Sequence, residues 1–213
     1  MKGRFSVTGI RSIKKQTDNN YINMYKMEAE RRDGGTFEYF MVSRKKRPED
    51  FYMNTKKLKA DGVLIYGIYG ENRDKVVLVR QYRYPINGYI YEFPAGLVEE
   101  GESARDTAVR EAFEETGMEF EPLDVNGCYE KPFFTTVGMT DETCSAVYGY
   151  YKGTPSSKNI TCDEDIEVVV ADRDECRRIL KEENVAVMCA YMLMHFINSE
   201  GDPLEFLKAA DKT

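Results

Sequence analysis

Apolar and polar residues alternate in two short stretches near the N-terminus. Residues 21–27 (YINMYKM) and 36–42 (TFEYFMV) follow a period of two, and the turn sequence DGG lies between them. This pattern predicts antiparallel strands joined by a tight turn. Residues 44–59 are basic, include Pro48 and show little periodicity, so we interpret them as a linker.

The rest of the chain alternates between strand and helix patterns. Strands are predicted at 62–69, 76–82, 89–93, 123–130, 143–151 and 166–171. Helices are predicted at 103–116, from Asp172 or Asp174 to 182, and to 198 from a cap at Asn184, with Ser103 capping the first. Strands flanked by separated helices predict a mixed α/β sandwich. We expect an N-terminal β-sheet subdomain over 1–57 and a second domain over 58–213.

Carboxylates are concentrated in the segment GLVEEGESARDTAVREAFEETGM, which begins at Gly96. Glu111, Glu114 and Glu115 stand at i, i+3 and i+4, so a helix would place them on one face. Their mutual repulsion would be offset by a bound cation. Hard oxygen ligands without a nearby histidine suit Mg²⁺ or Mn²⁺ bridging to phosphates. A solvated acidic helix is the alternative, and an apolar helix side counts against it: Ala104, Ala108, Ala112 and Phe113.

This segment resembles the signature of the Nudix hydrolases, a family that uses divalent metal to cleave a nucleoside diphosphate linked to another moiety. All its fixed positions are present: Gly96, Glu102, Arg110-Glu111, Glu114-Glu115 and Gly117. The resemblance implies a Nudix-type α/β/α sandwich with a mixed sheet, in which the signature forms a loop, a helix and a loop. It implies Glu111 and Glu115 as metal ligands and catalytic residues, assisted by Glu114 and the carbonyl of Ala95. Glu102 and Arg110 would brace the loop against the helix.

The residues before the signature point to a substrate class. Residues 81–97 read QYRYPINGYIYEFPAGL and look like the ADP-ribose pyrophosphatase branch. The match implies that Arg83 holds the diphosphate, with Gly96 also at the substrate. A guanidinium suits two adjacent phosphates better than a lysine does. Val137 stands where that branch has Pro-Gly, so the sequence does not assign the contacts on the terminal-ribose side of the pocket.

The N-terminal sheet also resembles this branch, in which such a sheet exchanges between two subunits and its aromatic residues sandwich the adenine. The match places Tyr21 and Phe37 against the base and Glu38 as a hydrogen-bond acceptor. Stacking on a base contributes about 1–3 kcal/mol. Ordinary sheet aromatics are an equal alternative for Tyr21 and Phe37. Tyrosine-rich surfaces also suit subunit contacts, so we expect a homodimer.

Hydrolysis needs a further carboxylate that activates water. The branch takes it from a loop before the last strand, and here Glu164 matches best, both as this base and as a metal contact. Glu142 is the alternative base or a substrate contact. A solvated loop acid is the plain alternative for either residue. With ADP-ribose the products would be AMP and ribose 5-phosphate.

Other readings keep the fold but change the activity. The same chemistry could act on GDP-mannose, UDP-glucose or FAD, or the chain could be a non-catalytic module that senses ADP-ribose. Against a sensor stand the intact carboxylates and the lack of a basic helix-turn-helix after the signature.

Composition limits the partners. The chain has 213 residues and a formal net charge of −7, which argues against nucleic acid. Five cysteines without a CxxC spacing indicate reduced thiols and a cytoplasmic protein. The longest apolar run, 185–197, is too short to cross a bilayer, so no membrane partner is expected. The single histidine, His195, lies in that run and is interpreted as a packing residue.

Overall fold

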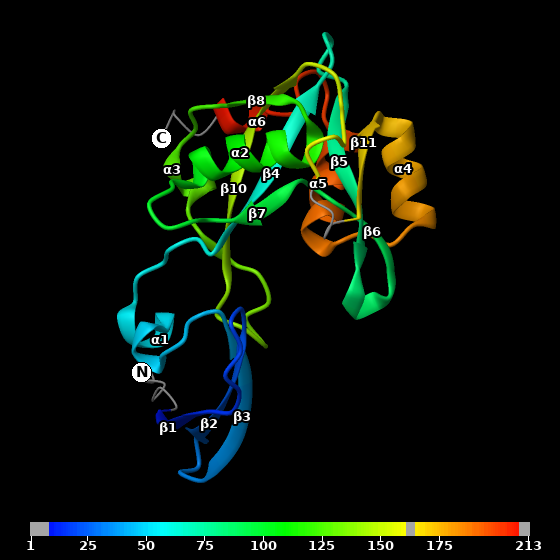
Figure 1. The fold of residues 1–213 in the computed structure, drawn as a ribbon. Coiled ribbons are helices and arrows are strands. Elements are labelled where there is room, and N and C mark those ends of the chain that lie inside the picture. Colours follow the sequence, from blue (N-terminus) through cyan, green and yellow to red (C-terminus); the bar gives the residue numbers. More distant parts are fainter. Residues whose placement is uncertain (1–8, 161–164, 209–213) are drawn as a thin grey trace. The chain divides into compact units, whose positions relative to one another are not determined.

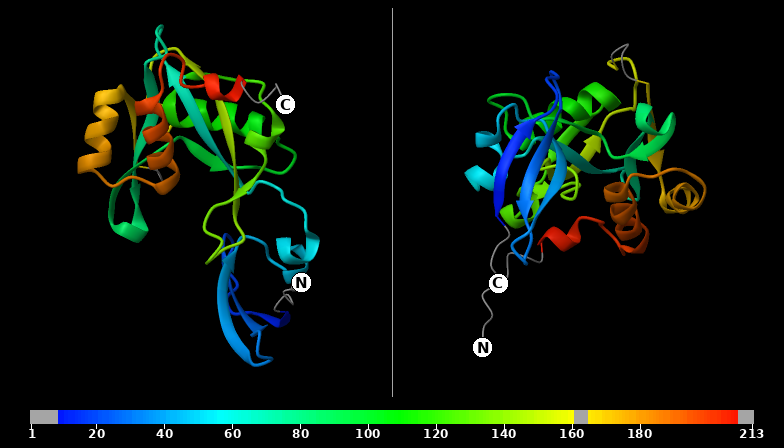
Figure 2. Two further views of the ribbon diagram at one scale, coloured as in Figure 1. Left: turned by 180° about the vertical axis from the view of Figure 1, so that it is seen from behind. Right: turned by 90° about the horizontal axis from the view of Figure 1, so that it is seen from below.

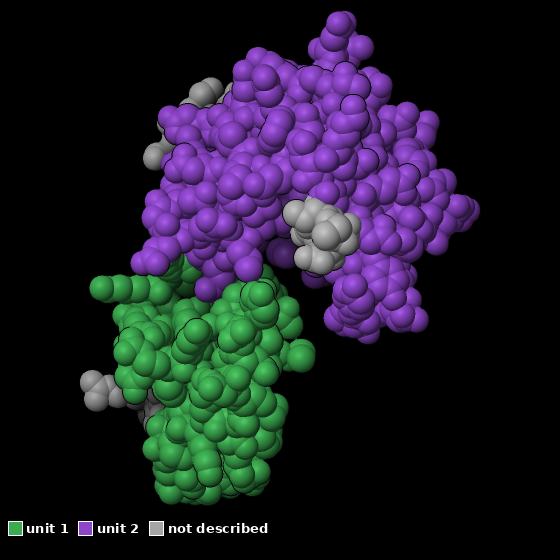
Figure 3. Space-filling view, viewed as in Figure 1, with its two compact units in different colours: residues 1–59, 133–143 green, residues 60–132, 144–213 purple. Residues whose placement is uncertain are grey.

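The protein divides into two compact units. The computed structural model describes residues 9–160 and 165–208. One unit contains residues 1–59 and 133–143, and the other contains 60–132 and 144–213 (Figure 3). The segment 133–143, which the sequence division assigns to the second domain, therefore clusters with the N-terminal unit.

The first unit is built on a three-stranded antiparallel sheet. Its strands are β1 (Ile10–Lys15), β2 (Asn23–Glu30) and β3 (Thr36–Ser43), in that order. The two strands predicted from alternation are confirmed as β2 and β3. One face of the sheet is closed by a small core: Tyr25, Met27, Met41 and Phe51.

The interpretation of 44–59 as a linker is wrong. This stretch contains a 3₁₀ turn, Pro48–Asp50, and the short helix α1 (Tyr52–Thr55). Phe51 is fully buried, and its ring meets Tyr25 edge-on with centroids 4.8 Å apart. Burial of the Phe51 side chain thus attaches this basic, aperiodic segment to the sheet.

Residues 133–143 are held by the third strand of this unit. They begin with the two-residue strand β9 (Phe133–Phe134). The amide of Val42 donates to the carbonyl of Met139 at 2.9 Å, and the Tyr39 hydroxyl donates to the carbonyl of Gly138 at 2.5 Å. These contacts join positions about a hundred residues apart.

The second unit contains a mixed sheet with the strand order β11-β5-β4-β10-β8. The bounds are β4 (Gly62–Tyr69), β5 (Lys75–Arg83), β8 (Glu119–Pro122), β10 (Thr143–Lys152) and β11 (Ile166–Ala171). Strands β4 and β10 are parallel, and the other neighbours are antiparallel. Off this path, β6 (Gly88–Glu92) pairs with β5, β7 (Ala95–Leu97) pairs with β4, and β9 pairs with β10.

Helices cover both faces of this sheet (Figures 1 and 2). On one face lies α2 (Ala104–Thr116), and on the other lie α4 (Arg173–Glu182), α5 (Val187–Asn198) and α6 (Glu205–Lys208). Strand alternation separates the two cores: Val77 packs under α2, whereas Val76 and Leu78 face the other helices. The predicted α/β/α sandwich with a mixed sheet is confirmed.

Two local predictions fail here. Residues 123–130 are not a strand, because Asn126 caps the short helix α3 (Gly127–Glu130) and β8 ends at Pro122. Asn184 does not cap α5. Its carbonyl instead accepts from Tyr91 N, and Ala186 N donates back to Tyr91 O, so this stretch is paired with β6.

The single histidine is a packing residue, as the sequence predicts. His195 packs against Phe206 with centroids 4.6 Å apart, and its Nε2 lies 3.0 Å from the carbonyl of Pro203. Cysteines 128, 176 and 189 are free thiols, the Cys144 Sγ donates to the carbonyl of Ser145 at 3.6 Å, and Cys162 lies outside the described residues. Across 9–160 and 165–208, the helices are all too short or too polar to cross a membrane.

Candidate active site

The helix α2 begins and ends where its sequence dictates. Asp106 N donates to the Ser103 hydroxyl at 3.2 Å, and Ser103 N donates to the Asp106 carboxylate at 3.3 Å, which forms a capping box. At the other end Gly117 adopts a φ of 68°, and its amide donates to Phe113 O at 2.9 Å. The predicted cap at Ser103 is confirmed, and the helix presents its glutamates in a fixed register.

Two of these glutamates meet the backbone of β7. A Cβ on Gly96 would lie 1.9 Å from the carboxylate of Glu111, so only glycine leaves room for this approach. The amide of Ala95 donates to the carboxylate of Glu115 at 3.1 Å. Glu115 is itself buried. Because β7 pairs with β4 at Leu64 and Val63, the sheet fixes the strand that receives both carboxylates.

Arg110 connects the loop to the helix. Its Nε and Nη2 donate to the two carboxylate oxygens of Glu102, each at 3.0 Å, and Nη2 also reaches the carbonyl of Leu97 at 3.3 Å. Its Nη1 donates to Glu111 at 2.8 Å and to Glu114 at 3.0 Å. The expected bracing of loop against helix is present, and the guanidinium offsets part of the repulsion among the glutamates.

This bracing shifts the protonation of Glu102. Hydrogen bonds from the Arg110 guanidinium, and next from the Thr107 hydroxyl, lower the pKa of Glu102 from 4.5 to about 2. The same pairing with Glu102 raises the pKa of Arg110. The loop therefore carries a carboxylate that stays ionised far into the acid range.

The donor set fits a divalent cation in its chemistry. Glu111, Glu114 and Glu115 supply carboxylate oxygens, and the approach of Glu111 and Glu115 to β7 brings them next to the backbone at Ala95 and Gly96. Exposure separates an inner from an outer acid: the Glu111 side chain is 14% exposed and that of Glu114 is 51% exposed. In the arrangement described, with Arg110 between these two, the acidic side chains of residues 9–160 and 165–208 do not converge in a ready group of three ligands. Binding a cation through three of these carboxylates would therefore require rotation of the flexible glutamate side chains.

Arg83, the expected diphosphate contact, is the last residue of β5. Its Nε donates to the Glu92 carboxylate at 2.6 Å. Sequence reasoning did not select Glu92. The only signal that could have found it is its place in the strand that leads to Ala95, three residues later.

The expected base-binding residues lie in the first unit. Phe37 and Glu38 line a hollow of about 420 Å³, together with Lys14, Lys26 and Glu28 among others. Arg31 stands 5.8 Å from the centre of the Phe37 ring, and Glu38 is paired with Lys26. Tyr21 is exposed just before β2 and is not part of this hollow.

Of the two candidates for water activation, Glu142 lies among the described residues and Glu164 does not. Glu142 accepts from Arg44 Nε at 2.7 Å and from the Thr135 hydroxyl at 3.2 Å, so its carboxylate is already engaged. Glu164 lies outside the described residues. Its neighbour Asp165 is held by the Tyr89 hydroxyl at 2.6 Å.

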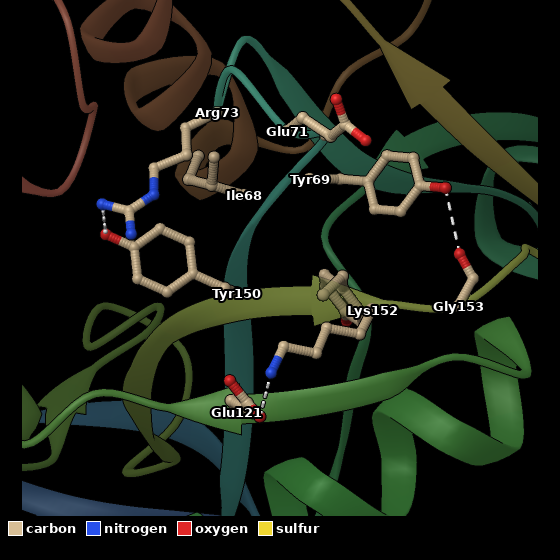
Figure 4. Close-up of a pocket in the computed structure, with 10 residues that line it drawn as sticks. Ile68, Tyr69, Glu71, Arg73, Glu121, Tyr150, Lys152 and Gly153 are labelled. Carbon is tan, nitrogen blue, oxygen red and sulfur yellow. Dashed lines mark hydrogen bonds and ion pairs between the residues drawn. The ribbon is translucent and has the colours of Figure 1, made fainter.

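A cavity of about 540 Å³ lies elsewhere in the second unit (Figure 4). Its basic residues are engaged: Arg73 with Asp202 at 2.5 Å, and Lys152 with Glu121. The cavity is lined by Ile68 and Tyr69 at one end of β4 and by Gly70 just beyond it, whereas β7 pairs with the Gly62–Leu64 end. At about 3.3 Å per residue these ends are roughly 20 Å apart. The cavity is therefore separate from the carboxylates of α2.

Comparison with known proteins identifies the family of this chain. The family profile described as NUDIX domain matches residues 58–187, more than half of the chain, so the protein belongs to the Nudix family. A methanol dehydrogenase activator from Bacillus methanolicus is 35% identical over 117 residues, which cover 54% of this chain and 60% of the relative. An ADP-ribose pyrophosphatase from Bacillus subtilis (strain 168) is 30% identical over 112 residues, covering 52% and 58%. An ADP-sugar pyrophosphatase from Mus musculus is 41% identical over 76 residues, covering 34% and 35%.

The matched regions thus span about 60% or less of the length of these relatives. A crystal structure titled ADP compounds hydrolase superposes with a TM-score of 0.67 and covers 100% of both chains at 15% identity. That likeness concerns the fold, and it includes both units of this chain.

Proposed function

We propose that this protein is a metal-dependent pyrophosphatase that hydrolyses the diphosphate of ADP-ribose or a related nucleoside diphosphate sugar. The observation that carries the proposal is the approach of the Glu111 and Glu115 carboxylates to the backbone at Gly96 and Ala95. The hard oxygen donors therefore lie at β7, which follows β6 and the Arg83-bearing strand β5 along the chain. The relatives named as ADP-ribose and ADP-sugar pyrophosphatases support the substrate class.

Each residue has a distinct part in the proposed reaction. Glu111, Glu115, Glu114 and the Ala95 carbonyl would hold Mg²⁺, or Mn²⁺, and a bound cation supplies neutralisation of charge on the phosphate oxygens. Arg83 binds the diphosphate. Glu164 accepts a proton from the water that attacks phosphorus, while the P–O bond to the leaving phosphate breaks. With ADP-ribose, one water is consumed and AMP and ribose 5-phosphate are released.

The first unit would supply the base contacts and the subunit interface. Large apolar side chains are exposed at its sheet: Tyr21 and Ile22 before β2, Met24 and Phe40 on one face, and Phe37 and Tyr39 on the other. A second copy could cover those on one face. Phe37 and Glu38 beside their hollow support adenine recognition, and the exposed aromatics support a homodimer. The free thiols support a reducing, cytoplasmic location.

The test is turnover with a panel of substrates. The purified chain is incubated with Mg²⁺ and ADP-ribose, GDP-mannose, UDP-glucose or FAD, and release of nucleoside monophosphate is measured. Fastest turnover of ADP-ribose supports the proposal, and faster turnover of another compound reassigns the substrate. Tight binding of ADP-ribose without turnover of any compound would identify a sensor.

A variant ties the turnover to the carboxylates. Glu115→Gln should abolish hydrolysis and leave the circular dichroism spectrum unchanged, because the amide keeps the shape of the side chain but loses its charge. Glu121→Gln, on the strand that follows α2, is the matched control and should retain activity, since Glu121 pairs with the surface residue Lys152. Full activity of Glu115→Gln would contradict the metal assignment.

A further inference from the structure

The ion pair between Arg83 and Glu92 spans an unusual length of sheet. In the register of β5 and β6, Arg83 lies opposite Gly88, and Glu92 lies opposite Val79. The two residues are therefore offset by four positions, or about 13 Å along the strands. Their side chains nevertheless meet at 2.6 Å. Both must extend toward each other along the surface of the sheet.

That surface is the face covered by α2. Val77 packs in the core beneath α2, and Arg83 has the same parity along β5. Glu92 is on this face too, because it is paired with Val79, and it ends β6 three residues before Ala95. The Arg83 guanidinium is consequently directed along the sheet toward the strand that receives the Glu111 and Glu115 carboxylates.

The pairing leaves most of the guanidinium available. An arginine has five N–H donors, and Glu92 takes the one on Nε. Among the described residues the Nη groups have no hydrogen-bond partner. The Arg83 side chain is 47% exposed, whereas that of Glu92 is 21% exposed, so the acid is the more enclosed anchor. A held Nε with two open Nη groups is the arrangement that suits two adjacent phosphates.

We infer that Glu92 is the positioning residue for Arg83: it draws the guanidinium back from the β5–β6 turn and aims its open edge at the diphosphate beside the signature helix. The inference rests on the proposed function, since it assigns a role within the same site. Glu92 does not touch the reacting atoms and acts only through Arg83.

The experiment compares two ion pairs on the same strand. Glu92→Gln removes the proposed anchor. Glu167→Gln is the matched control, because Glu167 pairs with Arg80 of β5 across the β11 register, at 3.5 Å. For Glu92→Gln we expect the KM for ADP-ribose to rise roughly ten- to hundredfold, the effect of losing a charged hydrogen bond, with a smaller change in kcat. Glu167→Gln should stay within about twofold of the wild type.

A double variant separates positioning from a general structural effect. Arg83→Ala alone should raise the KM, and Arg83→Ala combined with Glu92→Gln should be no worse than Arg83→Ala, because the anchor has nothing left to hold. Additive losses, or a Glu92→Gln enzyme that behaves like Glu167→Gln, would overturn the inference. A lower KM in Glu92→Gln would also overturn it, since it would show that the carboxylate mainly repels the substrate.

The proposed function and the positioning role can fail separately. If the wild type hydrolyses none of the panel, the proposed function is lost, and the role of Glu92 is decided by calorimetric titration with inorganic diphosphate. Weaker binding by Glu92→Gln than by Glu167→Gln supports the positioning role, and equal binding overturns it.

Discussion

The carboxylate of Glu111 occupies the space that a side chain at Gly96 would need, since a Cβ there would lie 1.9 Å from it. The contact joins the middle of α2 to β7. Glycine at this position therefore reflects close approach of a functional side chain to the backbone, rather than a turn. The atom in the way is the end of a flexible side chain, so a larger residue would displace the carboxylate rather than the fold.

Gly96→Ala should consequently reduce activity far more than stability. We expect kcat/KM to fall by roughly a hundredfold or more, because Glu111 is moved by an ångström or so from its place. The free energy of unfolding should fall by no more than about 1–3 kcal/mol. Steady-state kinetics and urea unfolding measure the two effects. Gly127→Ala is the control, because a Cβ at Gly127 meets open space, and it should change neither quantity appreciably.

The Glu102–Arg110 pair should make stability depend on pH in the acid range. The pKa of Glu102 is lowered from 4.5 to about 2 in the folded protein, so the pair stabilises the fold fully above pH 4.5 and loses this contribution as the pH falls toward 2. Urea unfolding of the wild type and Glu102→Gln, both in chelator, should therefore show a difference that is constant from pH 7 to 5 and shrinks below 4.5. A difference that does not change with pH would contradict the pairing.

Buried tyrosine hydroxyls offer a prediction about the core. Among the described residues the buried Tyr66 hydroxyl has no hydrogen-bond partner, whereas the equally buried Tyr25 donates to the carbonyl of Lys45 at 2.8 Å. Tyr66→Phe should leave the free energy of unfolding unchanged or raise it by up to about 2 kcal/mol, because no bond is lost. Tyr25→Phe should lower it by about 0.5–1.5 kcal/mol. Equal losses in the two variants, measured by denaturant unfolding, would contradict this reasoning.

Local chemistry explains which parts of the fold could be predicted. The helix α2 has its cap at Ser103 and its terminal glycine at Gly117 within the segment itself, and the contact of Arg110 with Glu102 spans eight residues. A continuous apolar run likewise located β4 at its full length. Such features depend on neighbours in the chain, and the sequence displays them directly.

The features that were missed depend on contacts between distant residues. The anchoring of Phe51 on Tyr25 and the attachment of 133–143 to β3 require partners that the local pattern does not show. The Arg83–Glu92 pair depends on the β5–β6 register and on side chains extended along the sheet. Spacing in the sequence carries none of this information.

The two predicted helix caps, Asp172 and Asn184, also separate local interactions from contacts between distant residues. Asp172 accepts from the amides of Asp174 and Glu175 at 3.0 and 2.9 Å, as a cap should. Asn184 makes no cap, because its stretch pairs with Tyr91. Asp172→Ala should lower the free energy of unfolding by about 1 kcal/mol, and Asn184→Ala should stay within about 0.5 kcal/mol of the wild type. Thermal and urea unfolding would reveal a reversed order, which would contradict the cap assignment.

Kinetics can decide which carboxylate activates the water. Glu142 accepts hydrogen bonds from Arg44 and Thr135, so its carboxylate would have to release a partner before it could contact the attacking water. Glu164→Gln should therefore lower kcat roughly 10²- to 10⁴-fold with little change in KM, as loss of a general base does. Glu142→Gln should lower kcat by less than about tenfold, and Arg44→Ala should have an effect of similar size, because both break one pair. If Glu142→Gln loses the greater part of kcat while Glu164→Gln retains it, the base is Glu142, and its bond with Arg44 must open during turnover.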